Sequence, residues 1–431
     1  MTKTTIGSAA FDCGFMSYNE FDNDAYLDRK ISLLKSLFDS ALALSLDSLE
    51  FTIYNSPAKH FRQRCRFAII DERTNPSSSS GTPLFYHAMW DGGSPSIIVG
   101  SFPIASIQIY EIMPYMIRYL QESDRLSSSL KAVNYLSTTS GHLIVTLVYG
   151  SSIDGIDEEQ WIKAATALKD KLLADKTEIP SIKSINIIGR SKGAKLVIGN
   201  DHVQEVMHVQ DGRQLLYKQV ETGFSNPNSH VNVKVLDWIC ENVEAINKER
   251  MARDSDGTTT DESIRTRVAQ SSLDLLELYC GNGNHTIALS AYFRRILAVE
   301  LNKTLCEAAE ENLLLNKIDN VTIVPCDSEK FAMSILRRQS YFDPKDTSIT
   351  YSFGAVLVDP PRSGLDSKTR GMVSRYDYIV YISCNPDALV RDLKEICVSH
   401  DVANIAAFDQ FAYTPHLEVG VILRKKMTHA E

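Results

Sequence analysis

The chain lacks the features of membrane, secreted and metal-cluster proteins. No window holds about 18 consecutive apolar residues, the length that a transmembrane helix requires. The opening MTKTTIGSAAFDCGF has no basic segment followed by an apolar run, so we expect no secretory signal. The eight cysteines are scattered and none forms a C-x-x-C pair, which argues against a zinc site or an iron–sulfur cluster. Together these absences predict a cytoplasmic protein with reduced thiols.

An excess of positive charge is also absent. The net charge of -9 over 431 residues argues against nucleic-acid binding through bulk positive charge, although it leaves room for a local basic groove. The 44% of hydrophobic and 23% of charged residues are ordinary for a globular protein and exclude wholesale disorder. The length suggests two or three domains, each with a core of its own.

The residue pattern predicts four parts. Residues 1–50 form an N-terminal helical segment, because apolar residues recur at helical spacing from Asp24 to Leu46. Residues 51–200 read as an α+β domain of alternating strands, with helices at 105–122 and 157–174 and a serine-rich loop at 72–83. Residues 201–270 form a connecting segment that ends in a polar linker, and residues 271–431 form a catalytic domain.

The last part predicts an α/β fold. From Leu273 onward, six apolar runs alternate with helix-like segments: LDLLEL, RRILAVEL, VTIVP, GAVLVD, YIVYIS and EVGVIL. Continuous apolar strands separated by helices are typical of a doubly wound, largely parallel, Rossmann-like sheet that is buried on both faces.

A glycine loop follows the first of these runs. In LELYCGNGN, Gly281 and Gly283 allow a tight turn and a close approach of the backbone to a ligand. A dinucleotide fingerprint would place a glycine where Thr286 stands. Glu300 follows Gly281 by 19 residues and ends a strand, where its carboxylate can accept hydrogen bonds from both hydroxyls of a ribose. The spacing therefore favours a nucleoside cofactor without a pyrophosphate, and S-adenosylmethionine fits better than NAD.

Two further strands end in chemically capable residues. Asp359 ends VLVD, and the Pro-Pro turn after it holds Arg362 at the carboxyl edge of the sheet, although a purely structural turn explains this motif equally well. Cys384 follows YIVYIS at the same edge. A random cysteine is usually inert packing, but this position favours a nucleophile. Glu418, just before the last strand, could serve as its base, whereas His416 is better explained as structural.

Together, LELYCGNGN, DPPRSGLD, YISCNP, FDQF and HLEVG resemble the RNA (uracil-5-)-methyltransferases, and most closely their bacterial tRNA-modifying branch. The resemblance covers roughly residues 50 to 427. Relatives that modify ribosomal RNA often carry cluster-binding cysteines and an N-terminal oligonucleotide-binding domain, and this sequence shows neither. The resemblance implies a class I S-adenosylmethionine-dependent methyltransferase domain preceded by an α+β RNA-binding domain.

The resemblance also implies individual roles. Cys384 falls on the family's nucleophile and Glu418 on its base. The family's cofactor-binding positions fall on Tyr279, Asn284, Glu300, Asp359 and, where the family typically has glutamine, Asn226. The implied reaction is methylation of C5 of a uridine in tRNA, uridine 54 of the T loop, through a covalent adduct between the cysteine and C6. The implied partner is the T arm of tRNA, bound by a monomer.

Two basic runs are candidates for the RNA surface. His60, Arg62, Arg64 and Arg66 alternate, so on a strand they share one face, and a second run contains Lys183, Arg190, Lys192 and Lys195. Lys131 and Gly150 stand where some relatives have an aromatic residue and a histidine. Two other functions remain open: a non-catalytic RNA-binding or RNA-folding protein, and a C5-methyltransferase that acts on cytosine or on another RNA. Intact Cys384, Glu418 and Asp359 count against the first of these.

Overall fold

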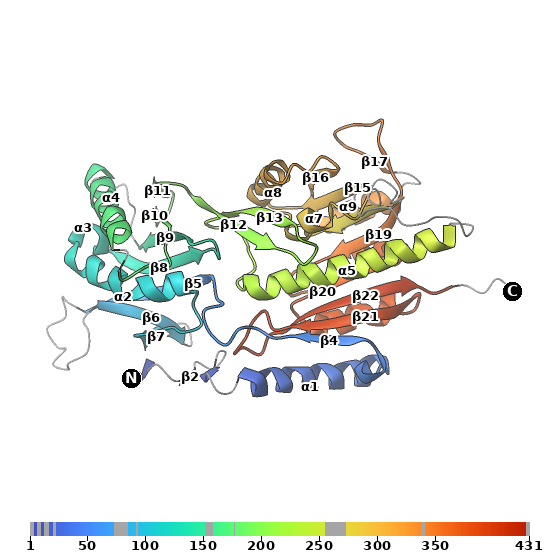
Figure 1. Cartoon of the computed structure of the whole chain (residues 1–431), viewed down its shortest axis with the longest axis horizontal. Coiled ribbons are helices and arrows are strands. Elements are labelled where there is room, and N and C mark those ends of the chain that lie inside the picture. Colours follow the sequence, from blue (N-terminus) through green and yellow to red (C-terminus); the bar gives the residue numbers. More distant parts are fainter. Residues whose placement is uncertain are drawn as a thin grey trace.

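Two mixed eight-stranded sheets form the frame of the molecule, each with its own hydrophobic core (Figure 1). The structure is a computed structural model. It describes residues 4–6, 10–12, 17–19, 23–72, 85–91, 94–150, 158–175, 177–254, 273–337 and 341–427. Among the described helices, none combines the length and the apolar character that a membrane span requires.

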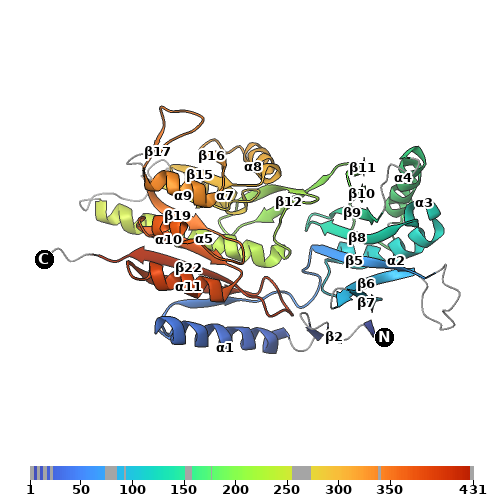
Figure 2. The same cartoon turned by 180° about the vertical axis from the view of Figure 1, so that it is seen from behind.

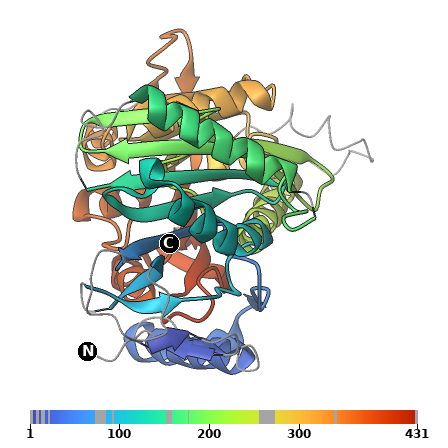
Figure 3. The ribbon, with the colours of Figure 1, turned by 90° about the vertical axis from the view of Figure 1, so that its left-hand side faces the viewer.

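The first sheet has the strand order β1-β7-β6-β5-β8-β9-β10-β11. Its strands are β1 (Thr4–Ile6), β5 (Arg64–Asp71), β6 (Phe85–Asp91), β7 (Ser94–Val99), β8 (Leu130–Ser137), β9 (His142–Tyr149), β10 (Ser184–Ser191) and β11 (Ala194–Ile198). Helices α2 (Ile107–Glu122) and α4 (Glu158–Ala174) share one core cluster with these strands, so they cover the same face of the sheet (Figure 3). The short helix α3 (Asp124–Ser127) joins α2 to β8.

The second sheet has the order β16-β15-β14-β19-β20-β22-β21-β4. The first five strands are parallel: β14 (Asp274–Leu278), β15 (Arg295–Glu300), β16 (Val321–Pro325), β19 (Phe353–Val358) and β20 (Tyr378–Ser383). Strand β22 (Glu418–Lys425) follows and is antiparallel to both of its neighbours, β20 and β21 (His400–Phe408). Strand β4 (Phe51–Tyr54) pairs parallel to β21 at the edge of the sheet. The Rossmann-like prediction is thereby confirmed for the parallel half of the sheet.

Both faces of the second sheet are buried, which explains its continuous apolar runs. Leu275 and Leu357 point into one core, and their neighbours Leu276 and Val358 point into the other. Helix α5 (Ser229–Asp254) covers the first face. The remaining helices of this part are α1 (Asn23–Leu42), α7 (Asn284–Leu289), α8 (Lys303–Leu315), α9 (Ser328–Leu336), α10 (Ser367–Val373) and α11 (Pro386–Ile396). Helix α1 packs beside α11 (Figure 2).

The structure divides the chain differently from the sequence pattern at three places. Strand β4 was expected in the α+β domain but joins the second sheet, because its partner β21 lies some 350 residues away and cannot be recognised from local sequence. The segment 201–234 contains a hairpin, β12 (His202–His208) and β13 (Gln214–Val220). Helix α5 occupies residues 229–254 of the predicted connecting segment. The predicted loop at 72–83 and the linker lie almost wholly outside the described residues.

Candidate active site

The predicted site residues meet at one edge of the second sheet. Tyr279, Asp359 and Cys384 each directly follow a parallel strand, and Glu300 ends another. Because β22 is antiparallel to β20, its first residue, Glu418, lies at this same edge. Ser383 pairs with Val419, so continuing the register by one residue sets Cys384 opposite Glu418. The candidate nucleophile and the candidate base thus come from adjacent strands, although they are 34 positions apart in sequence.

Two buried carboxyl groups, those of Glu418 and Asp359, dominate the electrostatics of this edge. Glu418 is only 5% exposed, and burial raises the pKa of its carboxyl well above the usual range, with the charge of Asp359 adding to the effect. Burial also raises the pKa of Asp359. The pKa of the half-buried Cys384 thiol is raised by burial and then by both carboxylates, whereas Arg362 acts in the opposite direction. A raised pKa makes Glu418 a stronger base once it is ionised.

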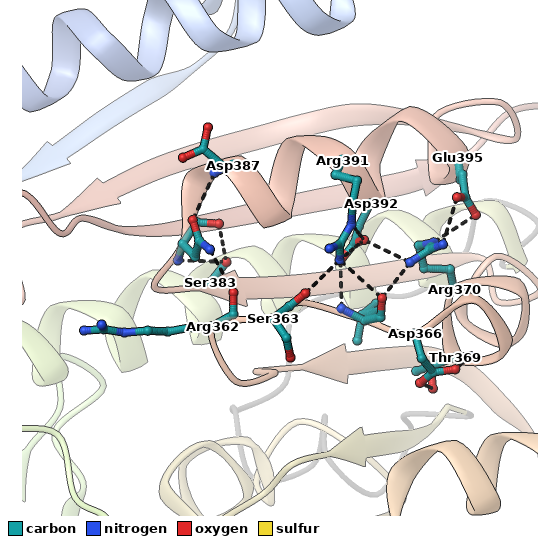
Figure 4. Close-up of polar contacts among 12 residues, drawn as sticks. Arg362, Ser363, Asp366, Thr369, Arg370, Ser383, Asp387, Arg391, Asp392 and Glu395 are labelled. Carbon is teal, nitrogen blue, oxygen red and sulfur yellow. Dashed lines mark hydrogen bonds and ion pairs between the residues drawn. The ribbon is translucent and has the colours of Figure 1, made fainter.

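A buried carboxylate, that of Asp392, ties the loop that carries Arg362 to α10 and α11 (Figure 4) and to β20, the strand before Cys384. Asp392 on α11 is fully buried and accepts hydrogen bonds from the Leu365 amide at 2.8 Å and the Tyr381 hydroxyl at 2.7 Å. The guanidinium groups of Arg370 and Arg391 contact its other oxygen. These bonds join α10, β20, α11 and the DPPRSGLD loop into one rigid unit.

Arg362 extends from this unit with its guanidinium unengaged among the described residues (Figure 4). Its backbone carbonyl accepts a hydrogen bond of 2.8 Å from Asn385 Nδ2. Asn385 is both the neighbour of Cys384 and the N-cap of α11, where its side chain accepts from the Asp387 amide. The arginine is therefore held beside the thiol by its backbone while its side chain stays exposed.

The glycine loop leaves open space beside its backbone, where a ligand could approach closely. Tyr279, Gly281 and Gly283 all have positive φ angles, of 62°, 58° and 84°. A Cβ atom added at Gly281 would meet no heavy atom within 4 Å, so the space beside this residue is open. Tyr279 is half-buried, and burial raises its pKa to about 12. A non-glycine residue at such a φ is uncommon, and such strain clusters at ligand sites.

Glu300 is oriented by this loop. Its Oε2 accepts from the Gly281 amide at 3.0 Å, and its Oε1 accepts from the Asn302 amide at 2.7 Å. A carboxylate offers about four acceptor positions, so each oxygen retains one for a ligand. These free acceptor positions fit the two hydroxyl donors of a ribose.

The two predicted asparagines are connected through a third that the sequence did not reveal. Asn226 Nδ2 donates to Asn232 Oδ1 at 2.6 Å, and Asn232 exchanges two hydrogen bonds with Asn284 at the start of α7. Asn232 lies on α5 and is 1% exposed. Its only sequence signal is a polar residue between valines in HVNVKV.

The basic runs are less uniform than predicted. Residues 60, 62, 64 and 66 do point away from the core, but β5 begins at Arg64, and His60 has a φ of 56°, so the four do not share one strand face. Arg66 lies over the Trp90 ring at 5.1 Å. Arg64 is turned toward the carbonyls of residues 220 and 221.

The second run is partly neutralised. Arg190 makes a bidentate contact with Glu221, and Lys195 pairs with Asp201 at 2.7 Å. Lys131 and Gly150 are neighbours, because a Cβ atom at Gly150 would meet the Lys131 side chain.

A surface pocket among the described residues lies away from this edge. The pocket, of about 410 Å³, lies between the β12–β13 hairpin and α8, where Lys218 and Leu314 line it, and none of the predicted site residues borders it. Within the described part of the chain, no three His, Cys, Asp or Glu side chains converge as metal ligands.

The chain is similar to known proteins over most of its length. The model of the tRNA (uracil-5-)-methyltransferase family matches residues 22–252 and 263–426. A tRNA/tmRNA (uracil-C(5))-methyltransferase of Neisseria meningitidis serogroup B is 36% identical over 94% of this chain and 99% of its own length. The protein of the same name from Erwinia tasmaniensis is 37% identical over 88% and 91%.

A solved structure shares the fold. It is the Pyrococcus abyssi tRNA (uracil-54, C5)-methyltransferase in complex with S-adenosyl-L-homocysteine, with a TM-score of 0.60 and 18% identity over 92% of this chain and 83% of that one.

Proposed function

Since the chain belongs to the tRNA (uracil-5-)-methyltransferase family, we propose that it methylates uridine 54 in the T loop of tRNA through a covalent bond between Cys384 and C6 of the base. Membership of the family makes the protein an S-adenosylmethionine-dependent enzyme that methylates C5 of uracil in tRNA. To what the family membership shows, the proposal adds the position of the uridine, the T arm as partner, the covalent route, and a monomeric, cytoplasmic enzyme. tmRNA, named for the bacterial relatives, is a second substrate candidate.

The chemistry requires a nucleophile because C5 of uracil is too weak to attack a methyl donor unaided. The thiolate of Cys384, whose proton has passed to water, adds through Sγ to C6, which turns the ring into an enolate with negative charge at O4 and C5. Bound S-adenosylmethionine supplies the electrophilic methyl group that C5 accepts. Glu418 then takes the proton from C5, the Sγ–C6 bond breaks, and the cysteine leaves as a thiolate.

The observation that carries this proposal is the proximity of Cys384 to Glu418: the ladder of β20 and β22 ends one residue before them, at Ser383 and Val419, and the charge of Glu418 acts on the thiol. A thiol and a buried carboxyl on neighbouring strands suit an addition at C6 and a proton removal at the adjacent C5. The charge of Arg362 favours the thiolate of Cys384 over its thiol, and we assign its exposed guanidinium to the enolate at O4. The base must leave its stack to reach this edge.

Trapping the adduct tests the proposal. Cys384→Ala should bind tRNA and cofactor but give neither methylation nor a covalent complex. Glu418→Gln can still add and accept the methyl group, so it should accumulate a protein–RNA adduct that survives denaturing electrophoresis and carries label from methyl-labelled cofactor. The adduct should disappear in the double variant. Cys397→Ala, which alters a half-buried thiol at the end of α11, is the matched control and should behave as the wild type does.

The same experiment also tests the position of the uridine. A tRNA transcript with cytidine at position 54 should form no adduct, and digestion of trapped tRNA should place the label at that position. Methylation by Cys384→Ala at the wild-type rate would contradict the covalent route. Label at another uridine would move the substrate site while leaving the route intact.

A further inference from the structure

A lysine from the N-terminal helix holds the loop that leads to Glu418. Lys30 lies on α1 and is 6% exposed. Its ammonium contacts Asp409 Oδ1 at 2.5 Å and donates to the carbonyl oxygens of His416 at 3.1 Å and Phe411 at 3.4 Å. All three acceptors belong to residues 409–417, the loop between β21 and β22, which lies against the N-terminal half of α1 (Figure 1).

The middle of the same loop is held from the opposite side. Tyr413 has a φ of 60°, is 1% exposed and lies in the core of the first sheet. Its ring packs against that of Phe61, with 6.4 Å between the two ring centroids. Its hydroxyl donates to the Ala58 carbonyl at 3.0 Å. The loop therefore bridges the two sheets, and its two ends depend on Lys30.

Those ends are the parts that determine where Glu418 lies. Asp409 directly follows Phe408, and Phe408 pairs with Glu418 in the ladder of β21 and β22. His416, whose carbonyl binds Lys30, precedes Glu418 by two residues. Fixing Asp409 and His416 to one ammonium thus closes the loop at the point where β22 begins.

Stability alone is a poor explanation for this ion pair. Both partners are almost completely buried, and burial lowers the pKa of Lys30 while Asp409 opposes the effect. Well-packed apolar residues often replace a buried ion pair without loss of stability. An ammonium has three N–H donors, and here each has an acceptor on the loop, a geometry that an apolar pair could not reproduce.

We propose that Lys30 is a positioning residue for Glu418: through Asp409 and the His416 carbonyl it sets the carboxylate where the C5 proton of the adduct is removed. The inference rests on the proposed function, in which Glu418 is the base. It predicts a defect confined to release of the methylated product, because Cys384 and the glycine loop lie on other strands.

Lys30→Met should therefore separate two steps that single-turnover reactions with methyl-labelled cofactor resolve. The labelled adduct should form at the wild-type rate but decay about 10- to 100-fold more slowly, the scale expected for a misplaced catalytic group. The control is Lys35→Met on the same helix, which removes an exposed ion pair with Asp47 and should change neither rate. A merely structural role would lower the folded fraction and reduce both steps together, which thermal unfolding measures separately.

A second variant protects the test against a failure to fold. Lys30→Met leaves Asp409 as an unpaired buried charge, whereas Lys30→Met/Asp409→Leu removes both charges and should recover much of the lost stability. It still lacks the bond to the His416 carbonyl, so its adduct should remain slow to decay. Decay at the wild-type rate in the folded double variant would overturn the positioning role alone. If Glu418→Gln traps no Cys384-dependent adduct, the proposed function itself fails, and this inference fails with it.

Discussion

Asn232 and Asn284 face each other through two reciprocal amide hydrogen bonds, of 2.8 and 3.0 Å, that join helix α5 to the start of α7. Asn226 shares the acceptor oxygen of Asn232. Asn226, which stands where the family typically has glutamine, is thus part of a chain of amide hydrogen bonds that supports the glycine loop. Its side chain is shorter than that of glutamine but still has a hydrogen-bond partner in Asn232. Asn312 on α8 also holds the glycine loop, because its side-chain amide donates to the Asn282 carbonyl at 2.9 Å.

Breaking this amide chain should weaken cofactor binding. Asn232→Ala leaves the amides of Asn226 and Asn284 without their shared partner, so we expect a loss of about 1–3 kcal/mol in stability and weaker binding of S-adenosylhomocysteine by calorimetry. Asn242→Ala is the matched control. It removes an amide pair with Asn404 from the same helix, about 15 Å further along at 1.5 Å per residue. Equal effects of both variants on cofactor affinity would show that the chain has no specific role.

The second prediction concerns the ribose acceptor. Glu300→Ala removes an oriented carboxylate and should cost about 2–4 kcal/mol of affinity for S-adenosylhomocysteine. Glu307→Ala alters an exposed carboxylate on the neighbouring helix α8 and should leave affinity unchanged. An unchanged dissociation constant in Glu300→Ala would place the adenosine elsewhere.

A third prediction links a buried carboxyl to pH. Glu277 on β14 is fully buried, accepts one hydrogen bond of 2.7 Å from Thr286, and burial raises its pKa to about 8 from 4.5. The folded protein thus holds a proton here that the unfolded chain releases near pH 4.5. The contribution of this proton to the free energy of unfolding is complete below that pH. It is lost as pH rises toward 8, and the free energy of unfolding falls by up to about 1.4 kcal/mol per pH unit.

Glu277→Gln cannot titrate, so its stability should fall less steeply over this window. Urea-unfolding curves between about pH 5 and pH 8 measure the two slopes. Parallel slopes for variant and wild type would mean that Glu277 is ionised in the folded protein.

The fourth prediction concerns RNA affinity. Arg66 and Lys131 have exposed side chains on β5 and β8, and Arg62, which is partly buried, lies just before β5, whereas Arg64 is turned toward backbone carbonyls. Replacing these three by alanine should weaken tRNA binding and lower the salt slope by up to about three phosphate contacts. Lys163→Ala on α4, an exposed change outside this group, is the control. A salt titration identical to that of the wild type would contradict an RNA surface here.

The sequence by itself determined the catalytic half of this protein. A parallel strand buried on both faces is a continuous apolar run, and ligands of open α/β sheets bind at the carboxyl ends of such strands. LELYCGNGN, VLVDPPR and YISCNP therefore indicate both the sheet and its candidate functional edge. Cys384, Asp359 and Glu300 could be proposed as site residues because their positions follow from strand ends, which are local properties of the chain, and the structure places them at one edge of the sheet.

Only the tertiary structure decided which distant residues support that edge. The pairing of β4 with β21, the contact of Lys30 with Asp409 and the amide chain through Asn232 join residues separated by 50 to about 380 positions. A buried polar side chain looks the same in sequence whatever partner satisfies it, because its hydrogen bonds depend on packing in three dimensions. The proposed nucleophile can therefore be predicted from its own strand, whereas the residues proposed to position the base are found only in the packed structure.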